Sequence, residues 1–384
     1  MADPGRLEQF EFFWRDHYDW FLEQGYQLRP RYNPKWVPSW ELDKNLRAGR
    51  TEDSLFLPNP NLNDAVQLSD NRHVALKKVN KTKHPHEISI MEYFSEEDLS
   101  TKSENHVVPL LAVLHPPGEV EIEVVVIPIL RAYDDPPLET LGEAVDYIRQ
   151  ILEGFAFLHE HRVAHRDVRF ENIMMDPSAL EYERFHFFNP NKRWDMGKPA
   201  VDLRAANDAT HKYTRTERRP KYYIIDFGFS TQYSPDEMPP SENPKPATDN
   251  TAPEFKDLTK PCDPFPLDVY VIGNMIRMDF LDGHVDESDR RGFHGVEFLR
   301  PLVDAMMKEK PEERITMKEA VTQFEEIVSK LSNLKLRSRV VPLTKDRLCS
   351  ENPFAWVVNS TVHWSKAFNY TIRGLPAIPA PPSS

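Results

Sequence analysis

Two motifs constrain this chain more than any other feature of its sequence. The first is His165-Arg166-Asp167, with Asn172 five positions after the aspartate, and the second is Asp226-Phe227-Gly228. They place two carboxylates and one carboxamide, in a fixed order, on two short connections. Such oxygens are ligands that Mg²⁺ accepts, and a carboxylate can take the proton of an attacking hydroxyl group. The combined order and spacing predict phosphoryl transfer from a nucleotide.

Other motifs follow in a consistent order along the chain. Val74-Ala75-Leu76-Lys77 reads as a strand that ends in a lysine, and Glu87 begins an apolar helical pattern ten residues later. Ala252-Pro253-Glu254 closes the segment after Asp-Phe-Gly, and Arg314 lies in a later polar turn. With these motifs the chain resembles the eukaryotic protein-kinase superfamily over about residues 60–330. The resemblance implies a bilobal α+β fold, with a small β-rich N-lobe and a mainly helical C-lobe.

The resemblance also implies roles for individual residues. Asp167 would be the catalytic base, Arg169 would replace the lysine of serine/threonine kinases, and Asn172 and Asp226 would hold Mg²⁺. Lys77 would bind the phosphates of ATP, with Glu87 orienting it as an ion pair. Lys78 and Glu92 are weaker rivals for these two positions. The implied cofactors are therefore ATP and Mg²⁺.

Residues 106–130 hold two apolar runs separated by Pro116-Pro117-Gly118, which predicts a hairpin that leads into the hinge between the lobes. Ile127 is the predicted gatekeeper beside the adenine pocket. Because Pro128 has no amide proton, Ile129 or Leu130 must supply the hinge backbone contacts.

A further set of residues is predicted to be structural. By resemblance, His165 and Phe227 stack with residues of the N-lobe into one column, Gly228 completes its motif, and Asp268 lies on the buried helix of the large lobe. Glu254 and Arg314 are predicted to form a buried ion pair. The N-lobe members of the column are Met91 and Leu110.

Composition agrees with one catalytic unit and its appendages. The chain has 384 residues, 40% of them hydrophobic, and a net charge of −13, which argues against a general nucleic-acid binder. Two cysteines cannot form a disulfide framework. The sequence has no run of eighteen apolar residues, so we expect no membrane span. The N-terminus does not read as a signal peptide. We expect a cytoplasmic or nuclear protein without a membrane or nucleic-acid partner.

We predict four regions from these patterns: an N-terminal helix and Pro/aromatic arm (1–54), an N-lobe (55–130), a C-lobe (131–335) and a C-terminal tail (336–384) that frays. The arm either packs its aromatic residues on the lobes, which we favour, or docks a partner. Its basic residues also permit contact with phosphate. They are Arg29, Arg31 and Lys35.

A basic insert at 177–220 separates Asn172 from Asp226. Within this region, the stretch from Arg184 to Lys221 holds ten Lys or Arg and four Asp or Glu, a local charge of +6. The favoured interpretation is a solvated loop that is dispensable for folding, and the alternative is a dock for an acidic partner.

Two departures bear on activity. Residues 55–73 contain no glycine, so the loop that lets backbone amides approach phosphate is missing. The segment before Ala252 lacks the usual phosphorylation pattern, and Thr248 and Thr251 are candidate substitutes. The leading hypothesis is a protein kinase that transfers the γ-phosphoryl of ATP to serine or threonine of a protein substrate. The alternative is a pseudokinase scaffold, and a small-molecule kinase is a weaker third.

Overall fold

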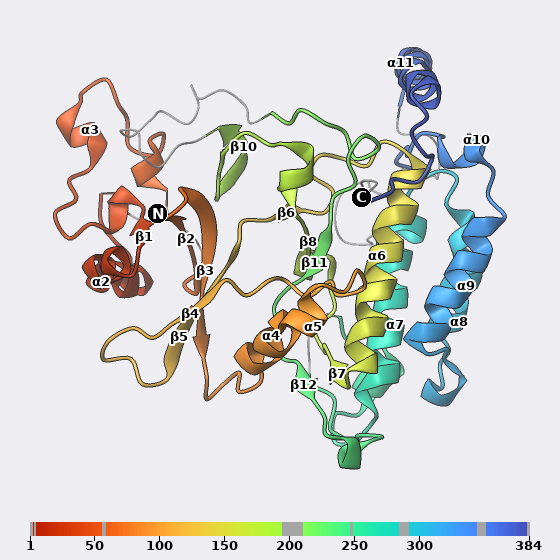
Figure 1. Cartoon of the computed structure of the whole chain (residues 1–384), viewed down its shortest axis with the longest axis horizontal. Coiled ribbons are helices and arrows are strands. Elements are labelled where there is room, and N and C mark those ends of the chain that lie inside the picture. The colour runs from red at the N-terminus through yellow and green to blue at the C-terminus, as the bar shows by residue number, and fades with distance from the viewer. Residues whose placement is uncertain are drawn as a thin grey trace. The chain divides into compact units, whose positions relative to one another are not determined.

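The computed structural model describes residues 3, 5–55, 59–193, 210–245, 249–283, 292–343 and 351–381. The chain divides into two compact units (Figure 1). The first unit contains residues 1–95, 108–131 and 181–212, and the second contains residues 96–107, 132–180 and 213–384. The first is built on a sheet and the second mainly on helices, which confirms the α+β fold class predicted from the motifs.

A five-stranded antiparallel sheet forms the first unit, with the strand order β1-β2-β3-β5-β4. Runs of valine and isoleucine explain its central strands, because β-branched side chains suit a pleated surface. The predicted hairpin of residues 106–130 is present as β4 and β5. The strands are β1 (Tyr26–Leu28), β2 (Leu62–Gln67), β3 (Arg72–Asn80), β4 (Ala112–Leu114) and β5 (Ile122–Pro128). The helix α4 (Glu87–Ser95) follows β3.

The N-terminal region is part of this sheet rather than a separate arm. Its β1 strand pairs with β2 over three residues, with Leu28 opposite Ala65. Two short helices, α1 (Phe12–Asp16) and α2 (Tyr18–Glu23), bring aromatic residues onto the strands. Trp14 and Phe21 are almost wholly buried there, and burial of such side chains stabilises the fold by about 1.5–3 kcal/mol each. Tyr26 and Tyr32 of the Pro/aromatic arm are buried in the same core, in agreement with the favoured interpretation that the arm packs its aromatic residues on the lobes.

Buried ion pairs fasten the segment that follows β1. The Arg29 guanidinium donates to Glu52 Oε1 over 2.5 Å, and Arg31 donates to both carboxylate oxygens of Glu11 over 2.8 and 2.9 Å. Both arginine side chains are fully buried. These two residues are therefore structural, and the phosphate contact considered for them from the sequence is wrong. The segment also contains α3 (Ser39–Leu42).

The expectation of a solvated insert is wrong for part of its described residues. Strands β9 (Phe185–His186) and β10 (Asn189–Arg193) form a hairpin that belongs to the first unit. Phe185 and His186 are buried, and His186 Nε2 lies 3.4 Å from Glu52 Oε1. The later part, from Tyr213, belongs to the second unit, where the buried Arg215 donates to the Tyr133 carbonyl over 2.8 Å.

Part of the insert's positive charge is matched inside the protein. Arg193 lies 3.0 Å from Glu183, Lys212 lies 3.1 Å from Glu181, and Arg219 lies 2.6 Å from Asp146. These pairs reduce the charge left to attract an acidic partner. Residues 194–209, including Trp194 and Pro199, lie outside the described residues.

A long helix, α6 (Leu141–Glu160), organises the second unit and runs beside α9 (Figure 1). It begins at a capping box in which Thr140 accepts from the Glu143 amide and Glu143 accepts in return. Nearly all of its positions toward the other helices are buried. The remaining helices of this unit are α5 (Glu97–Ser100), α7 (Pro264–Ile276), a π-helical extension (Arg277–Asp282), α8 (Arg300–Met306), α9 (Met317–Ser329), α10 (Asn333–Leu336) and α11 (Pro353–Ile372).

Short antiparallel pairs of strands hold the loops that carry the motifs. Strand β8 pairs with β11, and β7 pairs with β12. Their bounds are β7 (Val163–Ala164), β8 (Ile173–Met175), β11 (Tyr222–Ile224) and β12 (Thr231–Gln232). The two-residue strand β6 (Arg131–Ala132) follows β5 in the chain.

The tail is helical, contrary to the expected frayed end. Helix α11 begins at an Asn352 cap, and Tyr370 on its inner face lies 3.0 Å from the Thr214 hydroxyl. The prolines that suggested a frayed end, Pro376, Pro379, Pro381 and Pro382, lie beyond the last residue of this helix. Within the described part of the chain, no helix is long and apolar enough to cross a membrane.

The buried hairpin yields a prediction about stability. Phe185→Ala should lower the free energy of unfolding by about 3–5 kcal/mol, because it leaves a cavity where a buried ring packs under the Arg131 guanidinium. Urea denaturation of the full chain measures the change. Phe187→Ala, at a half-buried position two residues away, is the matched control and should cost less. Equal stability of wild type and Phe185→Ala would restore the solvated-loop interpretation.

Candidate active site

Lys77 and Glu87 form an ion pair in the first unit. Lys77 lies on β3 and its ammonium donates to Glu87 Oε1, while Glu87 is the first residue of α4 and is buried. The rival lysine is engaged elsewhere, since the Lys78 ammonium lies 4.5 Å from the centre of the Phe13 ring and burial lowers its pKa. The pair predicted from the sequence is thus the one that the fold brings together.

The connection between β1 and β2 is the place where a glycine-rich hairpin would lie. Here it spans residues 29–61 and contains one glycine, Gly49. The glycine-free stretch noted in the sequence, residues 55–73, covers only the end of this connection, because β1 lies much earlier in the chain. The absence of a glycine-rich loop therefore holds, but the segment that replaces it is the ion-paired one fastened by Arg29 and Arg31.

The predicted hinge residues follow β5 in the first unit. Ile127 is buried in β5 opposite Ala75 of β3. Leu130 is buried and Ile129 is partly exposed. Lys77 of β3 pairs with Val125 of β5, and Ile127 lies two positions after Val125 on the same strand. Side chains two positions apart on a strand share one face of the sheet.

Asp167 and Asn172 lie together in a loop of the second unit. The Asn172 side-chain nitrogen donates to the Asp167 carbonyl over 2.9 Å and to the Asp167 carboxylate over 3.3 Å. A short 3-10 turn (Phe170–Asn172) places the asparagine. Because the side-chain nitrogen of Asn172 faces Asp167, the side-chain oxygen of Asn172 is directed away from the Asp167 carboxylate.

Asp226 follows β11 with a left-handed backbone, φ +66°. Its carboxylate accepts from the Gly228 amide at 3.4 Å, and the Ile225 amide donates to the Asn172 carbonyl over 2.9 Å. Non-glycine residues rarely adopt this conformation, and such strain persists only where surrounding contacts impose it. The β8–β11 pairing supplies those contacts and brings the two motifs of the sequence side by side.

Asp268 on α7 anchors the loop that carries Asp167. Its carboxylate accepts from the His165 amide at 2.7 Å and from the Arg166 amide at 2.9 Å. His159 Nε2 lies 3.3 Å from the same carboxylate. Arg166 has φ +67°, so the buried Asp268 stabilises a loop conformation that the backbone would otherwise avoid.

His165 and Phe227 pack against each other in the second unit, with ring centroids 5.3 Å apart. The His165 Nε2 donates to the Ile225 carbonyl over 3.1 Å, and its Nδ1 accepts from the Asp167 amide at 3.3 Å. The other two predicted members of the column, Met91 and Leu110, belong to the first unit. Met91 is buried and Leu110 is partly exposed.

Arg169 differs from its neighbours in being partly exposed. Its guanidinium donates to Glu171 Oε2 over 2.9 Å, and the two side chains are 32% and 44% exposed. An exposed pair of this kind contributes little stability. The catalytic role of Arg169, which stands where serine/threonine kinases carry lysine, stays a prediction.

Glu254 and Arg314 form the ion pair predicted from the sequence. Arg314 donates to both Glu254 oxygens over 2.5 and 2.9 Å, and to the carbonyls of Lys308 and Pro266. The Arg314 side chain is fully buried. Because removal of one member leaves a buried charge uncompensated, the pair fastens the end of the segment that follows Asp226.

Glu242 is a site residue that the motif search missed. The buried Arg166 donates to Glu242 Oε2 over 2.8 Å and to the Thr231 hydroxyl over 3.1 Å. The backbone of Glu242 also bridges Cys262 in both directions, over 3.0 and 2.9 Å. The sequence could have indicated this contact, because Glu242 is an acidic residue in the segment for which only threonines were named as candidates.

Of those threonines, Thr251 donates to Asp249 and accepts from Asn274, and Thr248 lies outside the described residues. The contact with Arg166 in the described part of this segment is therefore made by a residue that is already negatively charged.

Comparisons with known proteins agree with this geometry. Residues 61–324 match the model of the protein kinase domain, which is more than half of the chain. The chain is 25% identical to the serine/threonine-protein kinase atg1 of Penicillium rubens over 104 residues, 27% of this chain and 10% of that protein. It is 39% identical to the serine/threonine-protein kinase CAK1 of Saccharomyces cerevisiae over 55 residues, 12% of this chain and 15% of that protein. The chain belongs to the protein kinase family.

Proposed function

We propose that this protein transfers the γ-phosphoryl group of ATP to serine or threonine residues of protein substrates. The carrying observation is the arrangement of Asp167 and Asn172, whose side chains contact each other in one loop. In it, Asp167 accepts the proton of the substrate hydroxyl. The two similar proteins are both named serine/threonine-protein kinases, which supports hydroxyl rather than phenol acceptors.

The oxygen ligands offered by Asn172 and Asp226 fit the cofactors that protein kinase domains use in general. Asn172 offers an amide oxygen and Asp226 a carboxylate, and both are hard oxygen ligands of the kind that Mg²⁺ prefers. When bound, Mg²⁺ neutralises negative charge that develops on the phosphates. Lys77, oriented by Glu87, would bind the phosphates of ATP.

A second candidate function is a scaffold that binds partners without efficient transfer. The segment between β1 and β2 favours it, because this segment has one glycine and is fixed by buried ion pairs. Backbone amides of such a segment do not approach phosphate as those of a glycine-rich loop do. Lys77, Glu87, Asp167, Asn172 and Asp226 are all retained, however, so we favour the enzyme.

The test compares wild type with Asp167→Asn, using radiolabelled ATP and a library of peptides with Ser, Thr or Tyr as the acceptor. The variant should lose about 10²–10⁴-fold in kcat, which is the usual contribution of a general base. ATP affinity measured by calorimetry should be unchanged, because the base acts on the hydroxyl. Asp304→Asn, at an exposed position, is the control.

Unchanged turnover in Asp167→Asn would remove that residue from its role. If wild type binds ATP but modifies no peptide, the scaffold function is correct. Preferential modification of tyrosine would overturn the assignment to serine and threonine.

The contact between Glu242 and Arg166 yields a second prediction. Glu242→Gln should lower kcat by roughly ten-fold, because a hydrogen bond to a charged group contributes about 1.5–3 kcal/mol and part of it should survive in the amide. Asp236→Asn, an exposed acid in the same segment, should leave kcat unchanged. Equal kcat for wild type and Glu242→Gln would show that Arg166 does not need this carboxylate.

A further inference from the structure

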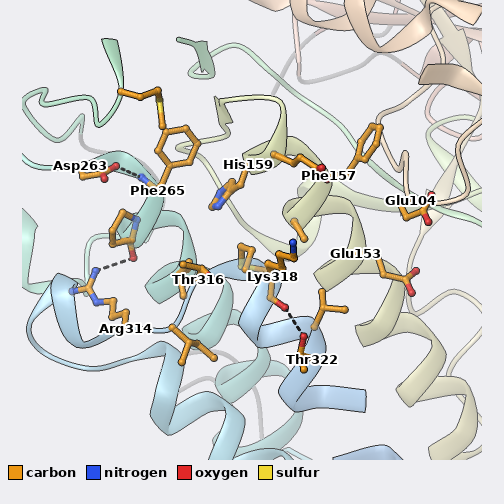
Figure 2. Close-up of a pocket in the computed structure, with 18 residues that line it drawn as sticks. Glu104, Glu153, Phe157, His159, Asp263, Phe265, Arg314, Thr316, Lys318 and Thr322 are labelled. Carbon is orange, nitrogen blue, oxygen red and sulfur yellow. Dashed lines mark hydrogen bonds between the residues drawn. The ribbon is translucent and has the colours of Figure 1, made fainter. Parts of the chain in front are cut away.

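A cavity of ≈ 830 Å³ opens in the second unit, between the C-terminal half of α6, the start of α7 and the start of α9 (Figure 2). We call it the α6–α9 groove. Its floor is apolar and is formed by Ala156, Phe157, Phe265, Val269, Ile315 and Val321. Its volume lies within the usual range of ligand pockets. None of the residues to which a catalytic or nucleotide-binding role is assigned above lines it.

The rim of the groove carries negative charge. Glu153 and Glu160 come from α6, Asp263 precedes α7, and Glu104 comes from the segment after α5. Figure 2 shows Glu104 and Glu153 on one side of the groove and Asp263 on the other. A cation bound over the apolar floor would therefore meet carboxylates from two directions.

The positive groups that line the groove leave this charge largely unmatched. Arg314 is buried and paired with Glu254, so its charge is already balanced. His159 points its Nε2 at Asp268, at 3.3 Å. Lys318, an exposed residue near the start of α9, is the remaining cation among the residues that line the groove. Among the residues that line the groove, four carboxylates thus face one lysine. From outside this lining, Arg219 and Arg149 act to lower the pKa of Glu153. Lys102 and Lys221 act to lower the pKa of Glu104.

Two of the carboxylates are also incompletely hydrated. Burial raises the pKa of Glu153, and it likewise raises the pKa of Asp263, which caps α7 by accepting from the Phe265 amide at 2.9 Å. A partly desolvated carboxylate gains more from a nearby cation than an exposed one does, because less water screens the attraction.

We propose that the α6–α9 groove binds a segment of a partner protein that carries an aliphatic or aromatic anchor residue flanked by lysine or arginine. The anchor fits the apolar floor, and the flanking cations fit the acidic rim. Because binding is read directly, this inference stands or falls independently of phosphoryl transfer. A second copy of this chain suits the groove less well, since each copy carries a net charge of −13.

The test pans a random library of 12-residue peptides against the immobilised full chain. Enriched sequences should combine Leu, Ile or Phe with adjacent Lys or Arg. A labelled synthetic peptide of the enriched sequence is then titrated by fluorescence anisotropy, in which its affinity should fall as salt is added.

Variants locate the peptide. Glu153→Gln combined with Glu160→Gln should weaken binding by about three- to ten-fold, as expected for two partly exposed ion pairs. Lys318→Ala should strengthen binding, because it removes the competing cation. Ala156→Leu should block the floor. Glu297→Gln combined with Glu326→Gln changes the net charge equally at exposed positions outside the groove and should leave the affinity unchanged.

Several results would overturn the proposal. The panning could enrich no peptide, or enrich acidic or uncharged peptides, or yield peptides that bind all variants equally. Binding of a fluorescent fatty acid that Ala156→Leu blocks and Glu153→Gln does not affect would assign the groove to an acyl chain instead. A dimer in sedimentation that Ala156→Leu dissociates would assign it to self-association.

Discussion

The carboxylate of Asp268 is the contact on which the catalytic loop depends. It accepts from two consecutive backbone amides, those of His165 and Arg166, from a position buried inside α7. These bonds stabilise Arg166 in a left-handed conformation, which a chain of L-residues avoids without such support. The loop in turn sets Asp167 beside Asn172. A buried residue of a helix therefore sets the conformation of this loop, and the loop carries the side chains to which the proposed catalysis is assigned.

Buried charge plays a comparable role in the first unit. Arg29 and Arg31 are buried, and each donates to a carboxylate and to backbone carbonyls. Such pairs are costly to break rather than strongly stabilising, so they specify the path of the described residues around Arg29, Arg31 and Glu52. A segment held in this way differs from a glycine-rich loop, whose backbone is freer. In the function proposed above, nucleotide binding therefore relies more on Lys77 and Asp226.

Much of the fold and of the site could be predicted because the decisive residues lie close in sequence or share a motif. Asp167 and Asn172 occupy one loop, and Glu254 is marked by the Ala-Pro motif before it. The pairing of β1 with β2 was not predictable, because it joins Leu28 to a strand more than thirty residues later. The burial of Phe185 depends on contacts from outside its own segment. Glu242 carries no motif, and its role appears only when the fold brings it to Arg166.

We propose that this chain binds nucleotide through Lys77 and a metal-binding Asp226, without a glycine-rich loop. Titration calorimetry of ATP tests it most directly, with wild type, Lys77→Met and Asp226→Ala, each in the presence of Mg²⁺ and of a chelator. We predict that wild type binds ATP only with Mg²⁺ and that each variant loses at least about ten-fold in affinity, since a charged contact to phosphate contributes more than about 1.4 kcal/mol. Equal affinity in all three proteins, or binding that survives removal of Mg²⁺, would contradict the account.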